Sequence, residues 1–463
     1  MIGAISSFMT RVVQRYLPDP LVFAIILSVI VFAWGYFVVD VSSAAALKAA
    51  GSAVTAGETP SALMSMTRFW GDGFWNLLAF TTQMAMIVVT GFALASSEPV
   101  KKLLKICASY AKTPKQAVAL VAFFGGVASA INWGFGLVIG ALFAKQIARN
   151  LKAVDYGLLI ACAYIGFMTW GGGLSGSMPL SAASADNGIV QKYLAGVPIP
   201  LTDTVFTWYN GFTILCLLVF MPILVTYMVP KEPKVVDPAL LAEEPSYQKE
   251  LPKDAPPALR MEESKSLAYI IVLVGIVYLV DYFMKKGFAG LDLNRVNLIF
   301  LVGGLALHKT PMAYMRAIQG AARSTAGILV QFPFYAAIAL MMEDSGLGGL
   351  ITDFFIDIAN KDNYAVWAFF SSAAINFAVP SGGGHWVIQG PFVLEAAKEL
   401  GADLGKATMA IAYGEQWANM AQPFWALPAL AIAGLGVRDI MGFCITALIF
   451  SLPIFVISLW FIP

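Results

Sequence analysis

Residues 117–149 read AVALVAFFGGVASAINWGFGLVIGALFAKQIAR, an apolar stretch interrupted at Asn132. Lys115 precedes it, and Lys145 and Arg149 lie at its end. Lys and Arg concentrate in the cytoplasmic loops of membrane proteins, so both ends of the stretch are expected on the same, cytoplasmic side. The stretch therefore predicts a re-entrant helical hairpin whose tip lies near Asn132.

The composition of the whole chain also indicates a membrane setting. Of its 463 residues, 59% are hydrophobic and 12% are charged, about half the charged share of a soluble domain. Further apolar stretches lie near 21–39, 74–95, 156–180, 208–229, 267–284, 296–307, 324–342, 364–398, 405–435 and 438–461. Helices are expected there, because backbone groups in lipid must be satisfied within the segment. Arg11 and Arg15 before the first stretch place the N-terminus in the cytoplasm.

Charge and cysteine usage exclude several classes of protein. The 29 Lys and Arg nearly balance the 28 Asp and Glu, and the basic residues sit in short clusters between apolar runs rather than on a nucleic-acid-binding face. No nucleic-acid partner is expected. The four cysteines are isolated, so neither a metal site nor a cofactor is predicted.

An internal repeat is the most informative feature of the chain. Ala-Ile-Asn-Trp at 130–133 recurs as Ala-Ile-Asn-Phe at 374–377, and each copy follows a Phe pair. Ala-Tyr at 163–164 recurs at 412–413 with nearly the same offset. Arg68 and Gln83 likewise recur as Arg316 and Gln331. Repeats of this kind are typical of secondary transporters.

The repeat divides the chain into a first membrane repeat at 1–229, a cytoplasmic linker at 230–266 and a second membrane repeat at 267–463. The linker is predicted from its prolines and its charges of both signs. Basic residues at His308 and Lys309 reverse the direction of the second repeat. The fold class is therefore an all-α polytopic membrane protein with two inverted-topology repeats, re-entrant hairpins and broken helices.

Each repeat contains two polar or glycine-rich breaks, which are expected to meet near the membrane midplane. A helix that restarts after a glycine run presents free N–H groups and a positive dipole end to an anion. No Lys or Arg lies in the breaks, which suits weak binding of a small monovalent carboxylate. The candidate substrate-binding residues are Asn132, Trp133, Gly134, Ser175, Ser177, Asn376, Ser381, Gly382, Gly383, Gly384, His385, Gln389, Asn419 and Gln422.

Two further features of the breaks bear on substrate fit and on ion coupling. Four tryptophans are expected to wall an apolar pocket for a short alkyl chain, namely Trp133, Trp170, Trp386 and Trp417. Ionisable groups within membrane segments are costly, so Glu415 and His385 are candidates for proton coupling. The alternative is a Na⁺ site near Asn132 and Asn376. In a purely structural interpretation, these two Asn residues only cap the helices of their hairpins.

Five stretches closely resemble the bacterial short-chain fatty acid transporters of the AtoE type, and the resemblance covers essentially the whole chain. They are Phe69 to Phe80, Ile131 to Gly140, Trp170 to Leu180, Asn376 to Pro391 and Ala412 to Pro428. The resemblance implies uptake of butyrate, acetoacetate and similar acids across the bacterial inner membrane. It also implies kinship with ion-coupled carboxylate transporters, many of which are homodimers.

The sequence thus predicts a symporter whose partners are a short-chain carboxylate, H⁺ or Na⁺, membrane lipid and a second copy of the chain. A passive anion channel or a transporter of a different small carboxylate is the alternative. A third hypothesis, a membrane-embedded hydrolase, would use Ser381 and His385.

Overall fold

The computed structural model describes residues 2–16, 18–43, 60–151, 153–185, 187–234, 236–241, 247–248, 251–252, 254–287, 293–322, 325–380 and 382–462. All regular secondary structure in these ranges is helical. The candidate residue Ser381 lies outside the described residues.

The first part of the chain contains α1 (Ile2–Tyr16), α2 (Pro20–Val38), α4 (Ala62–Gly73), α5 (Leu78–Ala95), α6 (Glu98–Ala108), α7 (Pro114–Ile131), α8 (Trp133–Asn150), α9 (Tyr156–Gly166), η2 (Phe167–Thr169), α10 (Ser177–Ala182), α11 (Gly188–Tyr193), η3 (Leu201–Asp203) and α12 (Trp208–Thr226). The segment between the two parts carries η4 (Pro238–Leu241) and α13 (Pro257–Glu262).

The second part contains α14 (Lys265–Lys286), α15 (Leu293–His308), α16 (Pro311–Ala322), α17 (Ala326–Asp344), α18 (Leu347–Ile356), α19 (Tyr364–Asn376), α20 (Gly382–Leu400), α21 (Leu404–Ala418), η7 (Asn419–Ala421), α22 (Ala426–Ala433) and α23 (Val437–Phe461). Both parts thus have a helix pair around the repeated Asn, followed by a helix that ends in a 3₁₀ turn and a short helix.

Local sequence signals explain where several of these helices begin. Thr113 caps α7 through a hydrogen bond from the backbone N–H of Gln116, with Pro114 in the first turn. Asn132 ends α7 and caps α8, so one amide creates the hairpin. Asp403 caps α21 in the same way.

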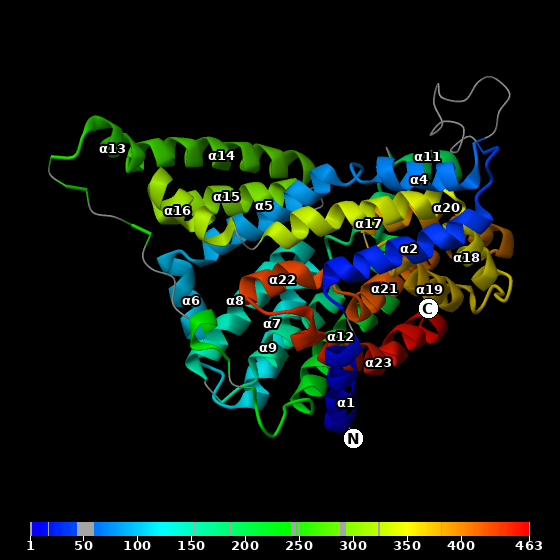
Figure 1. Cartoon of the computed structure of the whole chain (residues 1–463), viewed down its shortest axis with the longest axis horizontal. Coiled ribbons are helices and arrows are strands. Elements are labelled where there is room, and N and C mark those ends of the chain that lie inside the picture. Colours follow the sequence, from blue (N-terminus) through cyan, green and yellow to red (C-terminus); the bar gives the residue numbers. More distant parts are fainter. Residues whose placement is uncertain are drawn as a thin grey trace.

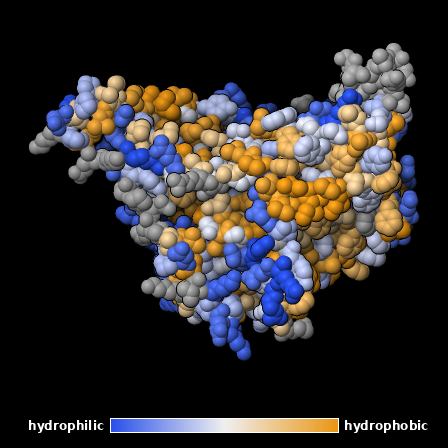
Figure 2. Space-filling model, viewed as in Figure 1, coloured by the Kyte–Doolittle hydropathy of each residue, from blue (hydrophilic) through white to orange (hydrophobic). Residues whose placement is uncertain are grey.

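Six helices within the described residues are long and apolar enough to cross a membrane: α2, α7, α12, α17, α23 and the segment that contains α14. They expose large hydrophobic side chains, most densely on α2 and α14. Figure 2 shows these hydrophobic surfaces over α2 and α14, whereas hydrophilic residues gather on the part of the surface around α1. Exposed bands of this size indicate contact with lipid.

Helices from each part pack against the other part. In Figure 1, α2 lies along α17, and α15 lies along α5. The short helix after the second break of each part also packs against the other part. Helix α10 of the first part packs against α20 and α21, and α22 of the second part packs against α8 and α9. This packing brings all four breaks to the centre of the molecule. The inverted orientation of the two parts stays a prediction.

Candidate functional site

The tip of the first hairpin is held by the first break. Asn132 is buried, and its side-chain oxygen accepts a hydrogen bond from the N–H of Phe135 at 3.0 Å. Ser175 is also buried, and its hydroxyl accepts from the N–H of Trp133 at 2.9 Å. Gly134 is buried in the same turn. The polar groups of this tip therefore bond mainly to one another.

The glycine run of the first break is closely packed rather than open. The N–H of Gly171 donates to the Gln416 side chain at 2.7 Å, and that of Leu174 donates to the carbonyl of Ala130 at 2.7 Å. A Cβ on Gly173 would lie 2.4 Å from the same carbonyl oxygen. These glycines allow close backbone approach, which is the structural role that small residues have in membrane helices.

The second hairpin contains a buried network of side chains. His385 Nε2 lies 2.7 Å from Gln389 Oε1 and 3.1 Å from the hydroxyl of Ser372. Gln389 donates to the hydroxyl of Ser371 at 2.6 Å. All four side chains are fully buried. The bonding pattern assigns the proton to Nε2, where His385 donates to Gln389.

A second set of amides joins the second hairpin to α21 and its break. Asn376 Nδ2 donates to the backbone carbonyl of Glu415 at 3.2 Å and to Asn419 Oδ1 at 3.0 Å. Gln422 donates to the same Asn419 oxygen at 2.8 Å. Asn376 therefore does not cap its hairpin as Asn132 does. Its own oxygen has no hydrogen-bond partner among the described residues.

The Glu415 carboxyl lies within this polar centre. Glu415 is 0% exposed, and neither of its side-chain oxygens has a hydrogen-bond partner within the described parts of the chain. No Lys or Arg is among the buried residues there. A buried charge without a partner is strongly unfavourable, so the neutral form of this carboxyl suits its surroundings best.

The N-terminal end of α20 is the most open of the glycine-rich segments. Gly383 is exposed, and a Cβ placed on it would meet nothing within 4 Å. A Cβ on Gly382 would lie 3.0 Å from both Ser177 and Trp170. Gly384 follows in the first turn and is partly buried. This helix end thus combines a positive dipole with space for a small anion.

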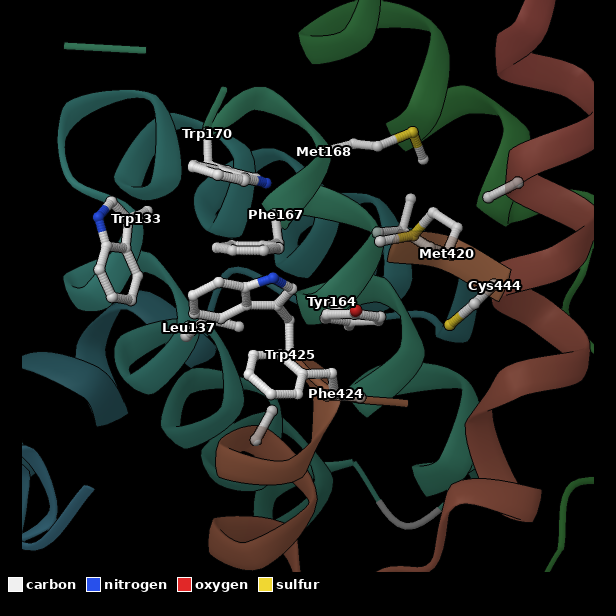
Figure 3. Packing of buried hydrophobic residues seen from close by; sticks show 14 of the residues in the cluster. Trp133, Leu137, Tyr164, Phe167, Met168, Trp170, Met420, Phe424, Trp425 and Cys444 are labelled. Atoms are coloured by element: carbon white, nitrogen blue, oxygen red, sulfur yellow. The ribbon is translucent and has the colours of Figure 1, made fainter. Parts of the chain in front are cut away.

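Aromatic rings from both halves of the chain surround the centre. Trp425 has its ring centroid 5.1 Å from that of Trp133 and 5.9 Å from that of Trp170. Phe167 stacks against Trp170 at 5.6 Å, as Figure 3 shows. Phe424 completes the group by stacking on Phe332 of α17 at 4.1 Å.

Of the four tryptophans predicted to form one wall, only Trp133 and Trp170 lie in this aromatic group. Trp386 donates to the side chain of Asn187. Trp417 packs against Phe369 and donates to the backbone carbonyl of Leu448 in α23. Composition alone does not separate these rings, because all four lie in or beside breaks.

Several residues of the centre were not among the candidates. They are Ser371, Ser372, Gln416, Phe424 and Trp425. The serines had a usable signal, since they follow the Phe pair of the repeat directly, where the first copy has two glycines. For the others the sequence carried no comparable signal.

Oxygen ligands for a cation are unevenly distributed between the two hairpins. The Asn132 oxygen is occupied by its capping bond, whereas the Asn376 oxygen and the Glu415 carboxyl are available. Within the described ranges no group of three or more His, Cys, Asp or Glu side chains forms a metal cluster. A Na⁺ ion near Asn376 would be held by oxygen ligands, which hard cations prefer.

Apolar helices with lipid-facing surfaces enclose a polar centre that is lined with aromatic rings. No Lys or Arg is among the buried residues of this centre. This combination defines a multi-pass membrane protein of the transporter class.

Comparison with known proteins gives the family. Residues 1–462 match the family described as short chain fatty acid transporter. The chain is 63% identical over 461 residues to a protein of Escherichia coli strain K12, covering 99% of each, and 58% identical over 471 residues to one of Haemophilus influenzae, covering 100% of each. Both relatives carry a provisional description as short-chain fatty acid transporters. The chain belongs to the short-chain fatty acid transporter family, whose members are transporters and not enzymes.

A solved structure also resembles the chain. It is that of the YdaH transporter from Alcanivorax borkumensis, described as having an unusual topology. The TM-score is 0.44 at 15% sequence identity, and the match covers 95% of this chain and 98% of the other.

Proposed function

We propose that this protein is a proton-coupled symporter that carries butyrate, acetoacetate and similar short-chain acids across the bacterial inner membrane, with its N-terminus in the cytoplasm. Family membership supports short-chain fatty acids as the substrate class. The single observation that supports symport is the Glu415 carboxyl, which is fully buried without a hydrogen-bond partner among the described residues. A neutral carboxyl in such surroundings is suited to carrying a proton.

The substrate carboxylate is proposed to bind at the N-terminal end of α20. Gly382 and Gly383 leave room there, and Ser177 lies beside them. The first-turn N–H groups and the helix dipole favour a negative charge without requiring a cationic side chain. The alkyl chain is proposed to lie against the aromatic group around Trp170 and Trp425, where apolar surface is available.

The test is uptake of radiolabelled butyrate into proteoliposomes under an imposed pH gradient or an imposed Na⁺ gradient. Empty liposomes measure diffusion of the neutral acid. Accumulation above this control under the pH gradient is expected. Accumulation only under the Na⁺ gradient would instead favour a cation site near Asn376, and uptake that needs no gradient and shows no counterflow would indicate a passive anion channel.

The role of Glu415 is tested by Glu415→Gln, which keeps the side-chain size and removes the exchangeable proton. We expect gradient-driven accumulation to be lost while butyrate counterflow persists, because the empty and loaded carriers no longer differ by one proton. Glu399→Gln on the exposed end of α20 is the matched control and should behave as the unmodified protein. Retained accumulation in Glu415→Gln would exclude this residue as the coupling group.

A further inference from the structure

Two glutamines occupy matching places in α5 and α17, and they are in different states. Gln83 donates to the Asn294 side chain at 2.7 Å, and its backbone carbonyl accepts from Asn297 at 3.0 Å. Gln331 is 8% exposed, and its side-chain oxygen has no partner among the described residues. The side chain of the first glutamine is therefore hydrogen-bonded, whereas the side-chain oxygen of the second is buried without a partner in the described chain.

The helices that carry these glutamines have matching neighbours. Asn294 is the second residue of α15, which lies along α5, and Asp19 caps the start of α2, which lies along α17. Asn294 thus meets Gln83 near the start of one helix pair. Asp19 is placed near Gln331 at the start of the other pair, since both line one cavity.

That cavity has a volume of about 290 Å³. Its lining includes Gly327 and Gln331 of α17, Leu427 and Leu430 of α22, and Asp19. Asp19 and Gln331 are the polar side chains of its lining, and the other lining residues are glycine or apolar.

The ends of the two helix pairs are on opposite sides of the membrane by the distribution of basic residues. Asp19 follows Arg11 and Arg15, which places its end in the cytoplasm. The start of α5 lies at the other end of its helix from Lys101 and Lys102, which places Gln83 toward the outside. By this orientation the hydrogen-bonded Gln83 lies toward the outside and Gln331 lies toward the cytoplasm.

An aromatic stack begins at the residue that follows Gln331. Phe332 follows Gln331 directly and stacks on Phe424 with ring centroids 4.1 Å apart and planes inclined by 16°. Tyr335 packs edge-on against the same Phe424 ring. Opening this stack would join the cavity to the break that carries Gln422.

We propose that Gln83 with Asn294 and Gln331 with Asp19 are the two gates of this transporter, and that one closes as the other opens. This inference rests on the proposed transport function. In the alternate state the Gln331 amide donates to the Asp19 carboxylate, a charge-assisted hydrogen bond, and the Gln83–Asn294 bond is broken. Each gate is closed by helices from both halves of the chain, so the exchange couples the two membrane faces.

The proposal is tested by disulfide formation between cysteines at the cytoplasmic gate. The four native cysteines are replaced by Ala, and Asp19→Cys is combined with Gln331→Cys in reconstituted full-length protein. The rate of cross-linking reports how often this gate closes. Adding Asn294→Ala removes the hydrogen bond that holds the outer gate shut, and we expect about a fivefold faster cross-link, the population shift of one hydrogen bond.

Thr82→Ala is the matched control, because it lies beside Gln83 and its hydroxyl bonds only to the carbonyl of Leu78 in its own helix. It should leave the cross-linking rate unchanged. Equal rates with and without Asn294→Ala would overturn the gate proposal. If reduction of the disulfide restores butyrate uptake, the cross-linked protein is folded, so unfolding does not explain the loss of uptake in the cross-linked state.

Reactivity of Gly327→Cys with a thiol reagent gives a second reading, because this residue lines the cytoplasmic cavity and a Cβ there meets only the Gln331 amide nitrogen at 3.5 Å. We expect Asn294→Ala to slow the reaction, and an unchanged or faster reaction would contradict the exchange of gates. Neither measurement uses a substrate. Failure of butyrate uptake with intact gate coupling would therefore overturn the proposed function alone.

Discussion

The first and second hairpins share a chain path but differ in what fills their interior. After its Phe pair, α7 continues with Gly125 and Gly126, whereas α19 continues with Ser371 and Ser372. A Cβ on Gly126 would lie 2.8 Å from the Leu218 side chain of α12, and one on Gly125 would lie 3.1 Å from the carbonyl oxygen of Ala163 in α9, so these glycines let neighbouring helices pack closely on the first hairpin. Ser371 and Ser372 instead hold Gln389 and His385. One repeat has kept a packed interior, and the other carries the polar chemistry.

The difference indicates that duplicated segments need not contribute equally to a central site. The first hairpin positions its break and supplies aromatic rings. The second contributes the buried side chains of Asn376, Gln389 and His385. The following predictions test this division.

The largest effect is expected from Gly166→Ala in α9. The new Cβ would lie 2.6 Å from the backbone nitrogen of Gly126 and 2.7 Å from the carbonyl oxygen of Ala122, and backbone atoms cannot turn aside. We expect a loss of about 3 kcal/mol in the free energy of unfolding, measured by denaturation in detergent. Gly211→Ala in α12, where a Cβ meets nothing within 4 Å, is the control. Equal stability of the two variants would contradict the packed interior of the first hairpin.

A smaller loss is expected from Ser371→Ala in the second hairpin. The Gln389 amide then loses the acceptor that it bonds at 2.6 Å, and a buried unsatisfied donor costs about 2 kcal/mol. Ser129→Ala in α7 is the matched control. Its hydroxyl is buried without a partner among the described residues, so its removal should cost little. A more severe effect in the control would reverse the proposed division between the hairpins.

Trp425→Leu should change substrate preference more than stability. The ring joins the aromatic residues of both halves, and its loss leaves room for a longer alkyl chain. We expect the ratio of hexanoate to butyrate uptake to rise by roughly tenfold, the effect of one or two methylenes in an apolar pocket. Trp208→Leu, at a side chain that is 85% exposed, should leave the ratio unchanged. The same shift in both variants would place the alkyl chain elsewhere.

The smallest effect is expected at the linker, which touches both halves. The Lys234 ammonium lies 3.5 Å from the Asp439 carboxylate, with the two side chains 65% and 35% exposed. Exposed ion pairs contribute about 0.5 kcal/mol or less, so Lys234→Ala should hardly alter the unfolding midpoint. The backbone N–H of residue 234 still bonds Asp155 in this variant. A shift as large as that of Ser371→Ala would mean that the linker holds the halves together.

Much of the fold was predictable because its signals are local. The break at Asn132 was predicted from its polar side chain inside an apolar run, and Asn132 does end α7 and cap α8, whereas Asn376 in the second copy does not cap its hairpin. Apolar length identified the long helices, including the 267–284 stretch that became α14. The stretch at 296–307, short for a span by itself, extends at both ends into α15. Ends of helices were less predictable, because polar residues join a helix when neighbours protect its backbone.

The candidate site was predictable only in part. Polar residues inside apolar segments are recognisable as candidates because their burial in a membrane costs free energy. Six of them do lie in one buried region, namely Asn376, His385, Gln389, Glu415, Asn419 and Gln422. Their partners were not foreseeable. Gln416 reaches Gly171 across the repeat boundary, and Tyr164 donates to the Asn419 carbonyl at 2.9 Å.

By itself, the sequence determined that this chain is a helical membrane protein with paired breaks, and its motifs determined the family. Composition, caps and repeats act within one segment, so they can be read along the chain. Only the tertiary structure decided that Trp425 rather than Trp417 faces the centre, and that Gln83 is bonded while Gln331 is not. Those outcomes depend on which helices of the two halves lie side by side, and that contact has no local signal in the sequence.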